Sequence, residues 1–138
     1  GEFELQYDPT TDLRLLANYA YQRATDDNTD KLVGEAPNNQ IYGRTEWTFM
    51  PQWHTSLQVN WVGEQKRAKS DPRTTPVDDY VTVDLTLRKQ NLIDRLDATL
   101  MVKNIFDEDV FEPSAVGGVP GDYPMAGISL FGEVAYNF

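Results

Sequence analysis

The chain has 138 residues, 40% of them hydrophobic and 12% aromatic, which is enough to bury the core of one ordinary domain. A formal net charge of -10 argues against nucleic acid as a partner, because phosphate contacts need clustered Lys and Arg. The sequence has no cysteine and no window of roughly 18 consecutive apolar residues, which excludes disulfides, thiolate metal sites, cysteine nucleophiles and membrane-spanning helices.

Apolar and polar residues alternate with a period of two along most of the chain, which is the pattern of strands with one apolar face. No stretch with helical spacing and caps interrupts this pattern, so we expect an all-β fold. The runs predict strands of about nine to eleven residues, the length that crosses lipid obliquely, whereas strands in soluble domains average about five or six. In chain order the seven runs cover residues 1–7, 13–22, 40–50, 54–62, 81–88, 96–103 and 128–138.

The connections between these runs alternate strictly between short and long. The short ones are residues 8–12, 51–53 and 90–95, and the long ones are residues 23–39, 63–79 and 106–124. Barrels of the bacterial outer membrane show the same asymmetry, with short periplasmic turns and longer extracellular loops. On this assignment the chain ends on the periplasmic side.

Aromatic side chains concentrate near the predicted strand ends, as they do in the girdles at the two surfaces of a membrane. The apolar faces of the runs carry no charge, which fits contact with lipid because Arg or Lys at mid-bilayer costs about 2–4 kcal/mol. Charged residues such as Asp84, Arg88, Asp97 and Lys103 should then face the lumen. We assign five aromatic residues to the membrane interface: Trp47, Trp61, Tyr80, Tyr136 and Phe138.

These patterns predict an antiparallel meander of about seven long strands that forms the C-terminal part of a transmembrane β-barrel. Bacterial barrels have at least eight strands and normally an even number, so we expect residues 1–138 to be one segment of a larger barrel. Two alternatives remain open. One is a small outer-membrane barrel with an adhesive or structural role, and the other is a soluble carbohydrate-binding β-sandwich, which would also show seven alternating strands.

Three motifs resemble the C-terminal barrel of the TonB-dependent outer-membrane receptors. Residues 79–85, Asp-Tyr-Val-Thr-Val-Asp-Leu, are similar to the strand opening of that family, and residues 102–107, Val-Lys-Asn-Ile-Phe-Asp, to the signature after its penultimate strand. Ile105 stands there in place of the commoner Leu. The third motif is the last strand, which ends in Tyr136, Asn137 and Phe138.

The resemblance implies a parent protein with a barrel of about 22 strands around an N-terminal plug. It implies active uptake of a scarce nutrient, usually a ferric siderophore, driven by the TonB complex through a plug that lies outside these residues. The expected surroundings are outer-membrane lipid and lipopolysaccharide, with the C-terminus in the periplasm. Phe138 would be read by the barrel-assembly machinery, and no cofactor is implied.

Few residues suggest catalysis or metal binding. His54 lies two residues before Ser56 on the same predicted face, but no orienting acid or oxyanion site accompanies them, so we expect no enzyme. The Asp26 to Asp30 segment spaces oxygen ligands as calcium loops do, yet Lys31 stands where their glycine belongs. We therefore predict no metal site.

A basic cluster stands out in the acidic chain. Its members lie in the long connection after the fourth run, which is predicted to be extracellular. Lipopolysaccharide phosphates or an anionic ligand would fit such a cluster, although one-sided charge in a loop is often merely solvated. The hypothetical ligand-binding residues are Lys66, Arg67, Lys69 and Arg73.

Overall fold

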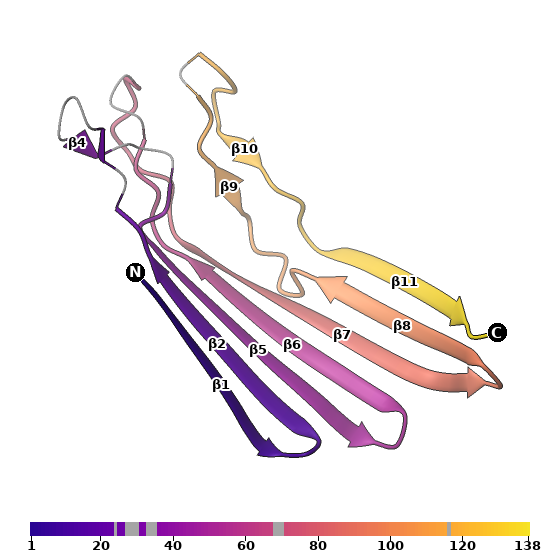
Figure 1. The fold of residues 1–138 in the computed structure, drawn as a ribbon. Coiled ribbons are helices and arrows are strands. Elements are labelled where there is room, and N and C mark those ends of the chain that lie inside the picture. Colours follow the sequence, from indigo (N-terminus) through magenta and orange to yellow (C-terminus); the bar gives the residue numbers. More distant parts are fainter. Residues whose placement is uncertain (24, 27–30, 33–35, 68–70, 116) are drawn as a thin grey trace.

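A computed structural model describes residues 1–23, 25–26, 31–32, 36–67, 71–115 and 117–138. Seven strands form one antiparallel sheet in the order β1-β2-β5-β6-β7-β8-β11, so each strand pairs with the next long strand along the chain (Figure 1). This confirms the predicted all-β meander. The strands are β1 (Glu2–Thr10), β2 (Leu13–Tyr21), β5 (Asn39–Met50), β6 (Trp53–Val62), β7 (Tyr80–Ile93), β8 (Leu96–Lys103) and β11 (Ser129–Tyr136).

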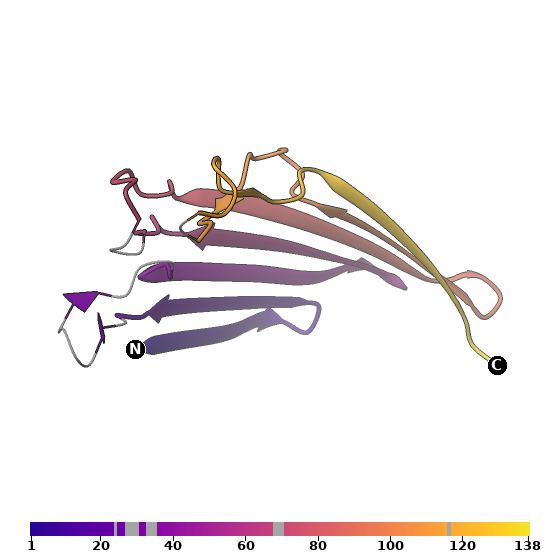
Figure 2. The same ribbon diagram turned by 90° about the horizontal axis from the view of Figure 1, so that it is seen from above.

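The sheet is a curved wall with different connections at its two ends (Figures 1 and 2). The short turns lie at one end and the long loops at the other, and the C-terminus lies at the turn end. Two pairs of two-residue strands lie within the loops: β3 (Thr25–Asp26) with β4 (Lys31–Leu32), and β9 (Phe111–Glu112) with β10 (Tyr123–Pro124). The described residues form no second packed layer, so the sandwich alternative is wrong. No helix in the described part is long and apolar enough to cross a membrane.

Three irregularities lie at the turn end of the sheet, and two of them lengthen a strand beyond its alternating run. β1 continues to Thr10 with a register shift after Tyr7, where Pro9 has no N–H to give to the ladder. β5 has a shift between Thr48 and Met50. β7 continues past Lys89 to Ile93, so the predicted turn over residues 90–95 shrinks to two residues.

The register places the apolar side chains of all seven strands on one face. Tyr7 pairs with Leu15, Leu57 with Leu85, and Val102 with Leu130, and such rows continue across the sheet. These residues remain exposed: Leu57 keeps 40% of its surface, Leu130 70% and Val134 68%. An exposed apolar face of this size needs a partner, and lipid is the partner that the alternating pattern predicts.

The small core of the described residues lies under the long loops rather than behind the sheet. The buried hydrophobic residues are Val62, Val77 and Val110, each at or beyond the loop end of a strand. Gln65 is also buried and exchanges two backbone hydrogen bonds of 2.9 Å with Val77. The two described arms of the loop over residues 63–79 thus bond to each other, and Arg67 connects them to Asp122 of the loop over residues 106–124.

Candidate functional site

The polar face of the sheet carries a ladder of ion pairs. Arg14 Nε lies 2.9 Å from Asp8 Oδ1, and Arg88 Nη2 lies 2.8 Å from Asp97 Oδ2. Asp97 is the buried member of its pair and also accepts a hydrogen bond from the Asn91 N–H at 3.0 Å. The structure thus places Arg88 and Asp97 together on the face that the sequence assigns to the lumen.

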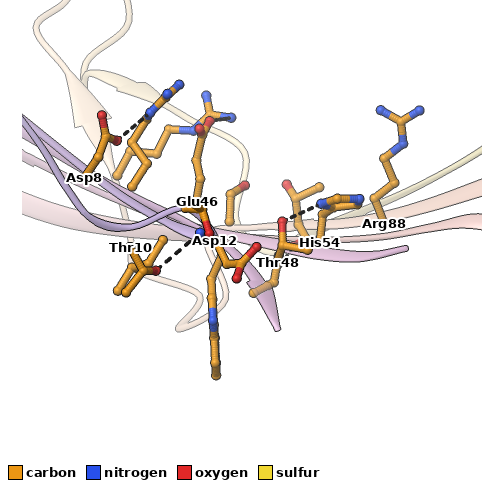
Figure 3. A pocket seen from close by; sticks show the side chains of 15 residues that line it. Asp8, Thr10, Asp12, Glu46, Thr48, His54 and Arg88 are labelled. Carbon is orange, nitrogen blue, oxygen red and sulfur yellow. Dashed lines mark hydrogen bonds and ion pairs between the residues drawn. The ribbon is translucent and has the colours of Figure 1, made fainter. Parts of the chain in front are cut away.

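This face is hollowed near the turns (Figure 3). The hollow measures about 560 Å³ and is lined from β1, β2, β5, β6 and β7. His54 lies in it, with Nδ1 2.9 Å from Thr48 Oγ1 and Nε2 3.1 Å from Gln90 Oε1. Because the Gln90 oxygen can only accept, Nε2 carries the proton and Nδ1 accepts from Thr48. Both ring nitrogens are engaged, so His54 has neither left to activate Ser56.

The motifs that resemble the receptor family hold the loop end of the sheet together. Asp84 Oδ1 accepts a hydrogen bond of 2.8 Å from the Asn104 N–H. Asn104 is buried and left-handed (φ 49°), and its side chain bonds the backbone of Glu108 through both amide atoms. Asp107 Oδ1 accepts from the Ile128 N–H at 2.8 Å, immediately before β11. These residues set the path from β8 into the last loop and back into β11.

Arg67 and Asp122 join the two packed loops. Arg67 donates from Nη1 and Nη2 to the two carboxylate oxygens of Asp122, both at 2.6 Å, and from Nε to the Thr75 carbonyl at 2.6 Å. The two charged side chains keep only 10% and 11% of their surface exposed. The paired guanidinium holds the pKa of Asp122 well below its usual range. We call the group formed by Arg67, Asp71, Arg73, Ser114 and Asp122 the loop clasp.

Arg73 completes the loop clasp. Its Nη2 lies 2.6 Å from Asp71 Oδ2 and 3.0 Å from the Ser114 carbonyl, and its Nη1 lies 3.2 Å from Asp122 Oδ1. Ser114 is almost completely buried and donates its own N–H to Asp122 Oδ1 at 3.1 Å. Hydrogen bonds from Arg73 lower the pKa of Asp71 from 3.8 to about 2.

The loop clasp includes two of the four residues of the predicted basic cluster. Arg67 and Arg73 both pair with Asp122 of the other loop, whereas Lys69 lies outside the described residues. Lys66 is exposed on the same loop. Sequence reasoning missed Asp71, Ser114 and Asp122, although the position of Asp71 two residues before Arg73 was a readable signal. Ligand binding by the cluster stays a prediction.

Strand pairing places four of the five predicted interface residues, three on the apolar face and one on the opposite face. The rings of Trp47 and Phe49 are tilted by 54° with centroids 5.7 Å apart, and the rings of Tyr136 and Phe138 meet edge to face at 5.3 Å. Trp61 donates its indole N–H to Asp79 Oδ2 at 2.9 Å. Trp47, Trp61 and Tyr136 are on the apolar face. Tyr80 pairs with Val62 and lies on the opposite face, so its place at the lipid interface stays a prediction.

The described residues contain no group of three or more His, Cys, Asp and Glu side chains arranged to hold a metal ion. Most of the calcium-like segment from Asp26 to Asp30 lies outside the described residues, so that hypothesis concerns residues 27–30 that the structure leaves out.

One apolar face, one charged face, short turns at one end and long packed loops at the other define the wall of a transmembrane β-barrel. The sequence model of the family described as "TonB dependent receptor-like, beta-barrel" matches residues 1–105. The chain therefore belongs to this family, whose members are outer-membrane receptors. The predicted resemblance is confirmed.

Solved structures support the same fold. The chain is similar to the ferric enterobactin receptor PfeA of Pseudomonas aeruginosa, with TM-score 0.83, 19% identity, and 99% of this chain covering 22% of that one. The siderophore receptor PirA of Acinetobacter baumannii gives TM-score 0.83 and 19% identity, with 99% and 21% covered. The copper transporter OprC gives TM-score 0.80 and 17% identity, with 99% and 23% covered. No curated protein matches the chain at a significant level.

The chain thus spans about a fifth of the length of each of these structures. The family and these relatives are receptors and transporters rather than enzymes.

Proposed function

We propose that residues 1–138 form the C-terminal segment of an outer-membrane barrel that actively takes up a ferric siderophore or another iron complex. The observation that carries the proposal is the family match over residues 1–105, together with a fold similar to those of two siderophore receptors. In this role the apolar face contacts lipid, the charged face lines the lumen, and the three long loops help to gather ligand outside the cell.

The driving force comes from elsewhere in the whole protein. A passive pore cannot concentrate a scarce ligand, so uptake requires the TonB complex, which acts on a plug outside these residues. The ion pairs of the lumenal face, such as Arg88 with Asp97, give that plug a polar wall to contact. The turn end, with the C-terminus, faces the periplasm.

The last strand has a second role in assembly. Tyr136 lies on the apolar face, and its ring meets that of Phe138, which is fully exposed. We assign to this aromatic end the contact with the barrel-assembly machinery. The exposed residues at the loop end of the sheet, which we call the rim and which include Lys66, face lipopolysaccharide or the ligand.

Copper is the second candidate cargo, because the copper transporter OprC has a similar fold at TM-score 0.80. An adhesive barrel without transport is the third reading. These functions differ in what crosses the membrane and in whether energy is needed.

The test expresses the whole protein in Gram-negative cells that lack their own siderophore receptors. Uptake of radioactive iron is measured with a panel of iron–siderophore complexes, and copper uptake is measured in parallel, with and without TonB. We expect iron uptake that disappears when TonB is deleted. Copper uptake alone would favour the second candidate, and surface expression without any TonB-dependent uptake would overturn the proposal.

A further inference from the structure

Lys89 occupies an unusual place on the sheet. The register pairs it with Trp53 on one side and Ala98 on the other, on the same face as Leu85 and Leu87. Among the residues that pair on the apolar face of the seven strands, all of which the structure describes, Lys89 is the only charged one. The alternating runs ended at Arg88, so the expectation of a face without charge is wrong at this position.

The depth of Lys89 follows from the two tryptophans of β6. Trp53 and Trp61 lie on the same face of one strand, eight residues apart. At about 3.3 Å per residue and a strand tilt of about 40°, their separation across the membrane is about 20 Å, close to the height of the apolar band. Trp61 lies at the loop end, so Trp53 and its neighbour Lys89 lie at the lipid surface on the turn side.

The ammonium of Lys89 points toward the turn rather than along the lipid face. Nζ donates to Gln52 Oε1 at 3.0 Å and lies 5.4 Å from the centre of the Trp53 ring. Gln52 belongs to the turn between β5 and β6, and its carbonyl accepts the Gln90 N–H at 2.8 Å. The lysine stem thus covers apolar surface while the charge reaches the polar boundary, as interfacial lysines do.

We propose that Lys89, Gln52 and Trp53 bind the phosphate of a phospholipid in the leaflet on the turn side. An ammonium has three N–H donors, and Gln52 takes one, which leaves two for phosphate oxygens. The Gln52 amide accepts through its oxygen, so its NH2 group can donate to the same phosphate. Along β7 from Lys89 toward the middle of the sheet, Leu87 and Leu85 continue the apolar face, and Ala98 and Val134 extend it sideways onto the next two strands, which suits the acyl chains of the same lipid. That apolar continuation favours a lipid over free phosphate.

The inference rests on the membrane location proposed above. The experiment purifies the whole receptor in detergent, adds phosphatidylglycerol, and counts bound lipid by native mass spectrometry. Lys89→Gln is compared with wild type and with Lys103→Gln, which removes a lysine from the opposite face. We expect Lys89→Gln to lower occupancy of one lipid about fivefold, the factor that one lysine contributes near an anionic membrane surface. Lys103→Gln should match wild type.

Two further arms identify the ligand. Diacylglycerol, which lacks phosphate, should bind wild type and Lys89→Gln equally, and Lys89→Arg should restore phospholipid binding. Equal phosphatidylglycerol occupancy in wild type and Lys89→Gln would overturn the site, as would displacement of the lipid by millimolar inorganic phosphate. Heat-modifiable migration in gels reports barrel assembly separately. If Lys89→Gln does not assemble, Gln52→Ala serves instead, and an unchanged occupancy in that variant would equally overturn the site.

Discussion

Replacing Asp122 by Asn should loosen the two packed loops without affecting the sheet. The substitution keeps the shape of the side chain but removes the charge that receives both Nη atoms of Arg67 at 2.6 Å. Arg67 would keep the Thr75 carbonyl and one neutral amide oxygen as acceptors, and its positive charge would lose this carboxylate. Asp122 also accepts the Ser114 N–H, which an Asn oxygen can still do.

The magnitude follows from burial. Removing one partner of a buried ion pair costs about 3–5 kcal/mol, because the other charge stays desolvated. The side chains of Asp122 and Arg67 keep 11% and 10% of their surface, so water relieves part of this cost. We therefore expect about 2–3 kcal/mol, reduced from the fully buried case by solvent screening. This energy corresponds to a rise of about 30- to 150-fold in the opening equilibrium of the loops.

Hydrogen exchange measures that equilibrium directly. The amides of Gln65 and Val77 bond each other's carbonyls inside the loop unit, so their protection reports its opening. Both should exchange faster in Asp122→Asn by the stated factor, while amides in the middle of β6 should not change. Asp109→Asn, which neutralises an exposed acid of the same loop, is the matched control. Equal protection in Asp122→Asn and wild type would refute a stabilising clasp.

Three further predictions concern pH, lipid contact and ligand contact. The folded pKa of Asp71 is about 2 against 3.8 unfolded, so its contribution to loop stability is complete above about pH 4 and is lost as pH falls toward 2. The protection factors of the loop amides, which correct for the intrinsic pH dependence of exchange, should fall over that window, and constant protection factors would contradict the prediction. Leu85→Arg should sharply lower the heat-modifiable fraction of the whole barrel, because a lipid-facing Arg costs about 2–4 kcal/mol at the midplane. Asp84→Asn keeps an oxygen that can accept the Asn104 N–H, so its effect should be mild. Equal tolerance of the two substitutions would disprove the assignment of the faces. The double change Lys66→Gln and Lys69→Gln should reduce ligand uptake at unchanged surface level, and unchanged uptake would remove the lysines from the ligand contact.

Period-two alternation predicts the strands and their faces well because side-chain direction is a property of the backbone itself. It fails at the end of β7, where residues 90–92 break the pattern. There the Gln90 N–H bonds Gln52 and the Asn91 N–H bonds Asp97, so pairing continues without alternation. At Tyr80 the alternation is reliable and the residue type misleads. Its position next to Val81 places it on the polar face, whereas its aromatic ring suggested the lipid interface.

The loop clasp could not be predicted from local pattern alone. Arg67 and Asp122 are 55 residues apart and come from different loops, so only the packing of those loops brings them together. The motif around Asn104 resembles the family by residue type, and the structure adds the physical reason, which is a left-handed buried Asn held from both sides. The family resemblance identified the motif in the sequence, and the hydrogen bonds of Asn104 explain why these residues occur there.

The basic residues of this loop can serve two roles, loop packing and ligand contact, and the loop clasp allows the two to be tested separately. Because Arg67 and Arg73 are held by carboxylates, replacing them disturbs loop structure and ligand contact at once. The hollow of about 460 Å³ beside them is lined by acids, including Asp78 and Glu108, and it would repel an anionic ligand. Positive charge for such a ligand must therefore come from the rim, where Lys66 is exposed. Substituting the lysines tests ligand contact with the loop pair intact, and substituting Asp122 tests the loop pair with the lysines intact.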